Sequence, residues 1–304
     1  MKIFSGSSNK PLAQNSAKEL GVKVSPLEIS VFPDGERRIR VVDSVVDEKT
    51  VVFQSTSTPP DQNYMELFFM VDALKRNGAS VVTAVIPYLG YERQDHVFRD
   101  GEAVSLEVIA ETLQRVGVDK LVAFDLHSIK VPELFTIPVL HLTALDLFAQ
   151  KIKELFPSDR NRQSLVLVSP DMGGIRRIKM LSESLGNISF ATVEKNRDLE
   201  TGDISDSSME GDVSGKTAII VDDMISTGRT IVAAEKILLE NGAEKVLVFA
   251  THAVFSENAE ELLQNLRAER VFVTDTIFIP EEKYFSKLEI ISVCKTIAEG
   301  LKHF

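Results

Sequence analysis

Hydrophobic residues in this chain gather in short β-rich runs that alternate with longer segments of helical periodicity. The runs predict strands at 50–54, 80–86, 120–124, 165–168, 217–221, 245–250 and 270–274. The segments between them predict helices at 64–77, 105–116, 174–185, 230–241 and 258–266. Apolar strands that alternate with helices of this length are typical of βαβ units, whose parallel sheets are covered on both faces. The predicted fold class is α/β.

An order of short sequence matches repeats once along the chain. Lys49-Thr50 is followed by a predicted strand, a polar turn, a helix and then Asn77-Gly78-Ala79. The same order starts at Lys216-Thr217 and closes with Asn241-Gly242-Ala243. The copies lie about half a chain length apart, which is too far for a solenoid repeat and suits a duplicated domain.

The repeat predicts two domains, over 1–145 and 146–304, and the length of 304 residues also suggests two. A polar stretch at 158–163 is expected to form a solvated loop inside the second domain. A closing helix near 291–302 could pack back on the first domain, a point that the sequence leaves open.

Composition and charge narrow the class of protein. With 44% hydrophobic and 26% charged residues, the chain is typical of a soluble globular protein. The 34 Lys and Arg against 45 Asp and Glu give a net charge of −11, which argues against binding to nucleic acid or to an anionic membrane. Small phosphorylated ligands stay possible, because they need only a few local cations. A single cysteine, Cys294, and the absence of a signal-like or membrane-spanning apolar run predict a cytoplasmic protein.

The segment with the clearest chemistry is 219–230, which reads IIVDDMISTGRT. An apolar strand is expected to end in Asp222 and Asp223, after which a Ser/Thr/Gly turn opens a helix. Backbone N–H groups at a helix N-terminus, together with hydroxyl donors, form a phosphate cradle. The acidic pair can accept hydrogen bonds from vicinal sugar hydroxyls, so the segment matches ribose 5-phosphate in size and polarity. An ordinary N-capping turn beside two acidic residues is the alternative.

This segment resembles the ribose-phosphate signature that phosphoribosyltransferases share with ribose-phosphate diphosphokinases, the PRPP synthetases. Four further segments are similar to diphosphokinase motifs and follow the order of that family: FPDGE at 32–36, PYLGYERQD at 87–95, DLHS at 125–128 and VSPDMGG at 168–174. The resemblance runs from Lys2 to about Ala298. It implies two similar phosphoribosyltransferase-like domains, each with a mainly parallel β-sheet flanked by helices.

The resemblance also implies an activity. An enzyme of this family transfers the β,γ-diphosphoryl group of ATP to the 1-hydroxyl of ribose 5-phosphate, giving 5-phosphoribosyl 1-diphosphate (PRPP) and AMP. In the family the loop at 32–36 reaches the ATP site of a neighbouring subunit. Self-association as a homohexamer or homodimer with an intersubunit active site is therefore implied.

Individual roles are carried over only where the residues match. The resemblance implies the following assignment: catalytic cations Lys195 and Arg197; ATP-binding Phe32, Asp34, Glu36, Arg93 and Gln94; Mg²⁺-binding His127 and Asp171; and ribose 5-phosphate-binding Asp222, Asp223, Ser226, Thr227, Gly228, Arg229 and Thr230. Positioned cations are the expected strategy for stabilising a transferring phosphoryl group.

Several positions depart from the family pattern. His96-Val97 stands where two basic residues are usual, and we expect Arg99 to compensate. Ser226 replaces a usual Asp and Arg229 a usual Gly, and phosphate binding should survive both changes. The segment 44–47, SVVD, lacks a phosphate-binding cation of the family's regulatory site, and a Ser-rich tail is missing. We therefore expect little dependence on inorganic phosphate and resistance to allosteric inhibition by ADP.

Two other functions stay open. A phosphoribosyltransferase that consumes PRPP would leave the repeat, the loop at 32–36 and Arg93-Gln94 unexplained. A catalytically silent regulatory homologue would account for the replacements at His96, Ser226 and Arg229, but the metal-binding and catalytic residues are retained. Formation of AMP from ATP without a nucleobase separates these functions.

Overall fold

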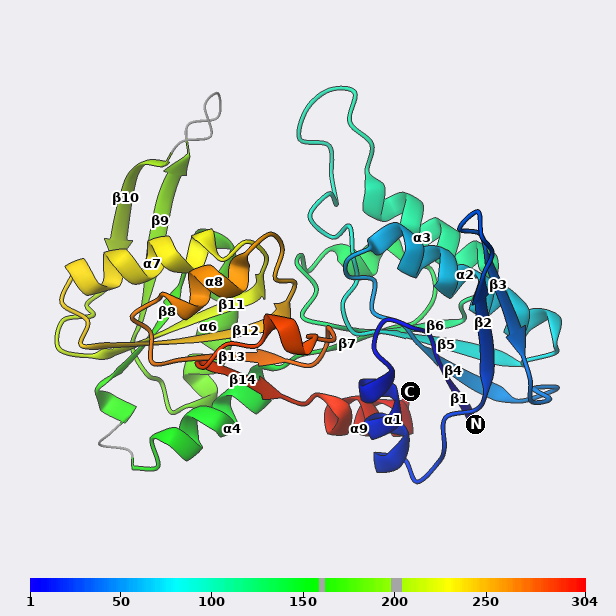
Figure 1. The fold of residues 1–304 in the computed structure, drawn as a ribbon. Coiled ribbons are helices and arrows are strands. Elements are labelled where there is room, and N and C mark those ends of the chain that lie inside the picture. Colours follow the sequence, from blue (N-terminus) through cyan, green and yellow to red (C-terminus); the bar gives the residue numbers. More distant parts are fainter. Residues whose placement is uncertain (159–161, 198–203) are drawn as a thin grey trace. The chain divides into compact units, whose positions relative to one another are not determined.

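The computed structural model describes residues 1–158, 162–197 and 204–304, and these form two compact units (Figure 1). Unit 1 comprises Met1–Thr143, Thr276–Phe278 and Ser292–Phe304, and unit 2 comprises Ala144–Asp275 and Ile279–Ile291. Each unit has its own sheet and its own apolar core. The loop expected at 158–163 includes 159–161, which lie outside the described residues.

Unit 1 is built on a five-stranded parallel sheet. Its strands, in spatial order, are β1 (Lys2–Ser5), β4 (Lys49–Phe53), β5 (Val81–Ile86), β6 (Lys120–Phe124) and β7 (Val139–Leu142). The central strands are apolar and buried along nearly their whole length, as expected of a sheet covered on both faces. One face packs against α2 (Pro60–Arg76) and α3 (Ser105–Val116), and α1 (Lys10–Glu19) and α9 (Cys294–His303) pack together on the other.

A separate two-stranded antiparallel hairpin, β2 (Leu27–Val31) and β3 (Arg37–Val41), lies against α2 in unit 1. Its turn contains the segment 32–36. Gly35 has φ +93, a left-handed conformation that favours glycine, and its N–H donates to Phe32 O. A short 3₁₀ helix, Val131–Leu134, completes the elements of this unit.

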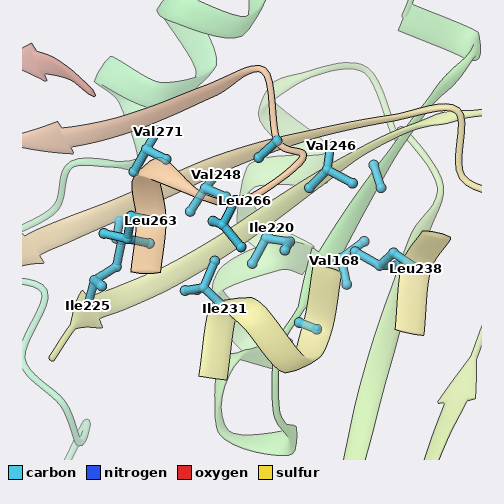
Figure 2. Packing of buried hydrophobic residues seen from close by; sticks show 14 of the residues in the cluster. Val168, Ile220, Ile225, Ile231, Leu238, Val246, Val248, Leu263, Leu266 and Val271 are labelled. Atoms are coloured by element: carbon cyan, nitrogen blue, oxygen red, sulfur yellow. The ribbon is translucent and has the colours of Figure 1, made fainter. Parts of the chain in front are cut away.

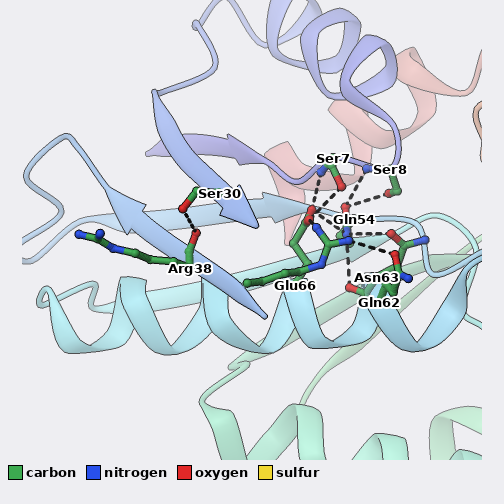
Figure 3. A network of polar contacts seen from close by, with 9 residues as sticks. Ser7, Ser8, Ser30, Arg38, Gln54, Gln62, Asn63 and Glu66 are labelled. Atoms are coloured by element: carbon green, nitrogen blue, oxygen red, sulfur yellow. Dashed lines mark hydrogen bonds and ion pairs between the residues drawn. The ribbon is translucent and has the colours of Figure 1, made fainter. Parts of the chain in front are cut away.

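A buried polar network follows β4 in unit 1 (Figure 3). Glu66 of α2 is fully buried and accepts hydrogen bonds from Ser7 N–H at 2.6 Å, Gln54 Nε2 at 3.0 Å and Arg37 Nη1 at 2.8 Å. Gln54 Oε1 accepts in turn from the N–H and hydroxyl of Ser8. The network joins four chain segments, and its polar groups satisfy one another's hydrogen-bonding capacity.

Unit 2 is built on a seven-stranded sheet that is parallel except for its first pair. Its strands, in spatial order, are β10 (Ile204–Glu210), β9 (Phe190–Arg197), β8 (Leu165–Ser169), β11 (Thr217–Ile225), β12 (Lys245–Ala253), β13 (Arg270–Thr274) and β14 (Leu288–Ile291). Its helices are α4 (Leu145–Leu155), α6 (Ile175–Ser184), α7 (Arg229–Glu240) and α8 (Ala259–Gln264), with short 3₁₀ turns at Met172–Gly174 and Glu281–Lys283.

The two faces of this sheet are covered by different helices. Val168 and Ile220 belong to a core with residues of α7 and α8, which Figure 2 shows from close by. Their chain neighbours Leu167 and Ile219 pack with residues of α4 and α6 on the opposite face. Successive residues of a strand point to opposite faces, so a continuous apolar run fills both cores.

The strand order is the same in both units. β1-β4-β5-β6-β7 of unit 1 corresponds to β8-β11-β12-β13-β14 of unit 2, where β9 and β10 extend one edge. The predicted α/β class is confirmed, and the helix at 105–116 and the strands at 120–124 and 270–274 have the predicted bounds. The sequence did not reveal β1, α1, α4, β7 or β14. No helix in the described part of the chain has the length and apolar composition needed to cross a membrane.

Candidate active site

The acidic pair Asp222 and Asp223 lies inside β11. The sequence predicts that the strand ends at these carboxylates, and this prediction is wrong, because β11 continues to Ile225. The reason is β12, which supplies backbone partners as far as Ile225, whereas β8 pairs with β11 only up to Ile220. The two carboxylates therefore sit on a strand that is paired on one side.

Burial of this acidic pair disfavours the charged form of Asp222. The two residues are 8% and 5% exposed, and burial together with repulsion from Asp223 raises the pKa of Asp222 well above its ordinary value. Arg177 of α6 opposes the shift, with its Nη1 3.7 Å from Asp222 Oδ1 and its Nη2 3.7 Å from Asp223 Oδ2. Sequence reasoning missed Arg177. The available signal was its place in the first turn of the helix that follows the Asp171 segment.

The turn after β11 leads directly into α7. Gly228 has φ +77, which suits glycine, and Arg229 is the first residue of the helix. Ser226 O accepts from Ser256 N–H at 3.0 Å, and Arg229 Nη2 donates to Glu257 Oε2 at 2.9 Å. The segment predicted to bind ribose 5-phosphate is thus one strand–turn–helix unit, Asp222–Thr230, whose turn is braced by the loop after β12.

Asp171 follows β8 in unit 2 and is exposed. Its Oδ1 accepts the N–H of Gly174 at 3.2 Å, so it caps the turn that opens α6. Its charge contributes to the raised pKa of Asp222, after burial and the effect of Asp223, which places it in the electrostatic neighbourhood of the acidic pair. A Cβ at Gly174 would lie 2.3 Å from Ser169 Oγ, so close packing requires glycine there.

Lys195 and Arg197 lie on β9. Their backbones pair with β10, where Lys195 is opposite Ser207 and Arg197 is opposite Ile204. The side chains of Lys195 and Arg197 lie outside the described part of the structure. Their catalytic role therefore stays a prediction.

In unit 1 Arg93 and Gln94, the pair predicted to bind ATP, lie in the loop after β5. Arg93 is exposed, and Gln94 Oε1 accepts the Ser105 hydroxyl at 2.7 Å, at the start of α3. Tyr91 has φ +68 and donates its hydroxyl to Asp61. The loop is thus fastened on both sides of Arg93, whose guanidinium faces solvent.

His127 follows β6 and is also exposed. Its backbone N–H donates to Glu92 Oε2 at 2.9 Å, and the preceding N–H of Leu126 donates to Nε2 of His141 at 3.1 Å. Sequence reasoning missed both Glu92 and His141, because each acts on a backbone group that carries no sequence signal.

The hairpin turn carries Phe32, Asp34 and Glu36, all exposed. Asp34 Oδ1 accepts the N–H of Glu36 at 3.1 Å, and the Phe32 ring is 47% exposed. Beside the turn lies a depression of about 500 Å³, lined by Gly35, Glu36, Arg37, Asp61, Gln62, Met65 and Phe69. An exposed ring beside carboxylates suits a flat heterocycle with N–H donors.

The donor set fits a magnesium ion that arrives with a nucleotide. Within the described ranges, no group of three or more His, Cys, Asp or Glu side chains is placed to hold a metal ion. Mg²⁺ prefers oxygen ligands, keeps several waters and commonly binds through one or two carboxylates plus substrate phosphates. The exposed carboxylate of Asp171 meets that requirement, and His127 offers one exposed imidazole in unit 1.

Comparison with known proteins identifies the family. A family model described as the N-terminal domain of ribose phosphate pyrophosphokinase matches residues 1–117, and one described as the phosphoribosyl synthetase-associated domain matches residues 198–304. A ribose-phosphate pyrophosphokinase of Fusobacterium nucleatum is 39% identical over 303 residues, covering 99% of this chain and 94% of the relative. The chain belongs to the ribose-phosphate pyrophosphokinase family.

Other pyrophosphokinases support this membership. The ribose-phosphate pyrophosphokinase of Aquifex aeolicus is 36% identical over 302 residues, which cover 99% of this chain and 95% of the relative. The solved structure of phosphoribosylpyrophosphate synthetase from Mycobacterium smegmatis has a TM-score of 0.92 and 36% identity, covering 99% of this chain and 97% of that one. The resemblance seen in the sequence motifs is confirmed over the full chain.

Proposed function

We propose that this pyrophosphokinase forms PRPP and AMP from ATP and ribose 5-phosphate. The observation that carries the proposal is the strand–turn–helix unit Asp222–Thr230, with a buried acidic pair followed directly by a helix N-terminus. One half of such a unit suits sugar hydroxyls and the other half suits a phosphate.

Ribose 5-phosphate is proposed to bind along this unit. Asp222 and Asp223 accept hydrogen bonds from the ribose hydroxyls, which enter a site where little water competes. The 5-phosphate meets the N-terminus of the twelve-residue helix α7. We assign the following residues to it: Ser226, Thr227, Gly228, Arg229 and Thr230.

ATP is proposed to bind to residues of unit 1. The adenine stacks on Phe32, while Asp34 and Glu36 accept from its N–H groups. The exposed guanidinium of Arg93 and the amide of Gln94 bind the phosphates. Support comes from the exposure of Phe32 and Arg93, since a ligand-binding side chain must be reachable from solvent.

In the proposed reaction, the 1-hydroxyl oxygen of ribose 5-phosphate attacks the β-phosphorus of ATP in line. The bond between that phosphorus and the α,β-bridging oxygen breaks, AMP leaves with the electron pair, and the hydroxyl proton passes to solvent. Lys195 and Arg197 offset the charge that accumulates on the transferred group. His127 and Asp171 are the residues proposed to offer ligands to Mg²⁺, which would neutralise charge on the triphosphate. No protein nucleophile is required, so positioning and electrostatic stabilisation supply the rate.

We further propose self-association, as a homodimer or homohexamer, in which the turn at 32–36 completes the ATP site of a neighbour. The exposed apolar side chains at this end of the hairpin, Val31 at 56% and Phe32 at 47%, support this proposal. The single cysteine suits a reducing compartment, and we place the enzyme in the cytoplasm.

Regulation by inorganic phosphate is proposed to be weak. Val46, which is 62% exposed, stands where a phosphate-binding cation would be needed. Activity measured against phosphate concentration should show no steep sigmoidal requirement, and added ADP should inhibit only by competing with ATP.

The proposed function is tested with the purified chain, ATP, Mg²⁺ and ribose 5-phosphate, without any nucleobase. We expect equal amounts of AMP and PRPP, measured by ion-exchange chromatography. Consumption of PRPP only when a base is added would identify a phosphoribosyltransferase instead. Absence of AMP from a folded, ligand-binding chain would identify a silent regulatory homologue.

A further inference from the structure

Two acidic residues bracket the ATP-binding pair Arg93 and Gln94, and each bonds to the segment that carries His127. We infer that Glu92 and Asp95 are positioning residues, which fix the imidazole-bearing segment 126–128 against the nucleotide-binding loop. The inference rests on the proposed function, because it assigns these acids a role in binding Mg²⁺–ATP.

Glu92 makes the inner contact. It is 2% exposed, and its Oε2 accepts the backbone N–H of His127 at 2.9 Å. The carboxylate also lies near the buried hydroxyl of Tyr64, whose pKa is raised first by burial and to a smaller extent by the charge of Glu92. A hydrogen bond from an N–H to a buried carboxylate is stronger and more restrictive than one made in water.

Asp95 makes the outer contact. Burial opposes its ionisation, but hydrogen bonds from His96 and Ser128 lower the pKa of Asp95, so it stays charged. Its side chain is 17% exposed, and His96 Nδ1 lies 2.6 Å from its Oδ1. Glu92 and Asp95 thus flank Arg93-Gln94 in sequence and bond to adjacent residues of the opposite segment.

Two further contacts hold this segment. His141 fixes the N–H of Leu126, and Thr143 donates its hydroxyl to Asp125 Oδ1 at 2.6 Å. The side chains that hold this segment bond to its backbone or to Asp125 and Ser128, while the His127 side chain is exposed. A segment fixed on its backbone, with an exposed histidine, is an arrangement that suits a ligand-binding residue.

The test compares four variants of the full chain. Glu92→Leu removes the acceptor, Glu92→Gln keeps an acceptor oxygen, and Ser128→Ala removes the outer contact. Glu235→Leu is the matched control, because Glu235 is a buried carboxylate of unit 2 that accepts the N–H groups of Arg267 and Ala268. Binding of Mg²⁺–ATP is measured by titration calorimetry without ribose 5-phosphate, and binding of ribose 5-phosphate is measured separately.

We expect Glu92→Leu to weaken Mg²⁺–ATP binding about 10- to 100-fold, the usual result of removing a residue that orients a metal ligand. Glu92→Gln should retain most of the Mg²⁺–ATP affinity, with a loss of about two- to five-fold, because its amide oxygen still accepts the N–H of His127. Ser128→Ala should cause a loss of similar size to Glu92→Gln. Ribose 5-phosphate affinity should stay unchanged, and Glu235→Leu should lower stability without altering Mg²⁺–ATP binding.

Unchanged Mg²⁺–ATP affinity in folded Glu92→Leu would overturn the inference, as would equal losses for both ligands. If circular dichroism shows that Glu92→Leu does not fold, the inference is tested with Glu92→Gln and Ser128→Ala. Wild-type Mg²⁺–ATP affinity in both of these variants would overturn the inference. A different result would reject the proposed function. Wild-type chain that binds Mg²⁺–ATP but forms no AMP would reject the reaction, while the binding measurements still test the two acids.

Discussion

Strands β4 and β11 occupy the same position in their respective sheets. The buried acidic residues near these two strands differ in how well the surrounding groups satisfy their charge. In unit 1, the Glu66 carboxylate accepts a hydrogen bond from the Arg37 guanidinium at 2.8 Å. It also accepts from the Ser7 N–H and the Gln54 amide within 3.0 Å. In unit 2, Asp222 and Asp223 repel one another, and Arg177 stays 3.7 Å from each. In unit 1 the buried carboxylate contributes to the stability of the fold. In unit 2 the burial of two neighbouring carboxylates disfavours their charged form.

This difference explains how a duplicated domain can divide its work. A buried acid whose donors are all close contributes to folding, and no ligand can improve its surroundings. A buried acidic pair in which the pKa of Asp222 is raised destabilises the free protein, but incoming hydroxyl donors would improve its surroundings. The copy with the less satisfied strand is therefore the one that we propose binds sugar, and measurements on variants of both units can test this difference.

The largest effect is expected from Glu66→Ala in unit 1. The substitution leaves buried donors of Arg37, Gln54 and Ser7 without their acceptor, and removing one partner of a buried pair costs about 3–5 kcal/mol. Denaturant unfolding should show this loss. The exposed control Glu48→Ala, whose partner is the N-terminus at 3.4 Å, should change stability by less than about 1 kcal/mol. Equal losses in the two variants would remove the structural role given to the network.

A smaller effect, on turnover, is expected from Lys195→Ala on β9, a strand without a counterpart in unit 1. Loss of one positioned cation should lower kcat about 100- to 1,000-fold, while the ribose 5-phosphate KM changes little. Steady-state kinetics checks this, with Lys236→Ala on the surface of α7 as a control. Intact turnover with weakened substrate binding would contradict the catalytic role.

Next comes Asp222→Asn, which should act on binding and on stability in opposite directions. The ribose 5-phosphate KM should rise roughly 10-fold or more, because an acceptor for a hydroxyl is weakened. Stability at neutral pH should increase by about 1 kcal/mol, since a buried charge disappears. Steady-state kinetics gives the first value and denaturant unfolding the second.

The pH dependence has a definite sign. The folded pKa of Asp222 lies above its ordinary value of 3.8, so the wild type is favoured at low pH and loses stability as pH rises through the folded pKa. The advantage of Asp222→Asn should therefore vanish on acidification. Asp212, whose pKa is lowered first by a hydrogen bond from Lys216, provides an opposite control, because Asp212→Asn can only remove a stabilising charge. A pH-independent advantage would show that burial does not penalise Asp222.

The smallest effect is expected from Arg229→Ala. The guanidinium is 73% exposed and pairs with Glu257, so stability should change by less than about 1 kcal/mol. The ribose 5-phosphate KM should rise about two- to five-fold, since backbone N–H groups and hydroxyls still hold the phosphate. The surface control Arg40→Ala should leave KM unaltered. A loss as large as that of Asp222→Asn would mean that Arg229 dominates phosphate binding.

The sequence predicted the α/β class because strands of a covered parallel sheet must be apolar almost throughout. It could not predict the end of β11, because Asp222, Asp223 and Ser226 suggest a turn. The extension depends on backbone pairing with β12, which reaches Ile225. Edge strands such as β1 and β14 are only four residues long, too short for a clear period.

The sequence alone suggests the candidate site where a local motif indicates roles, as in 222–230, and where family motifs imply them; these roles stay predictions. Contacts between distant segments could not be predicted. Arg177 faces the acidic pair because of how α6 packs against β8 and β9, and Glu92 bonds to a backbone N–H that any residue except proline at 127 would offer. Such partners emerge only when the chain is folded.

Unit 1 takes its residues from both ends of the chain, which sets an order for its assembly. Thr276 O accepts the Ser55 hydroxyl, and α9 packs on α1. A ribosome releases both segments after nearly all of unit 2, so the domain that is translated first is completed last. Any fragment that stops at Thr143 keeps α1 but lacks α9, so it should leave part of one face of its sheet uncovered, and the nascent chain has the same exposure until residues 292–304 emerge.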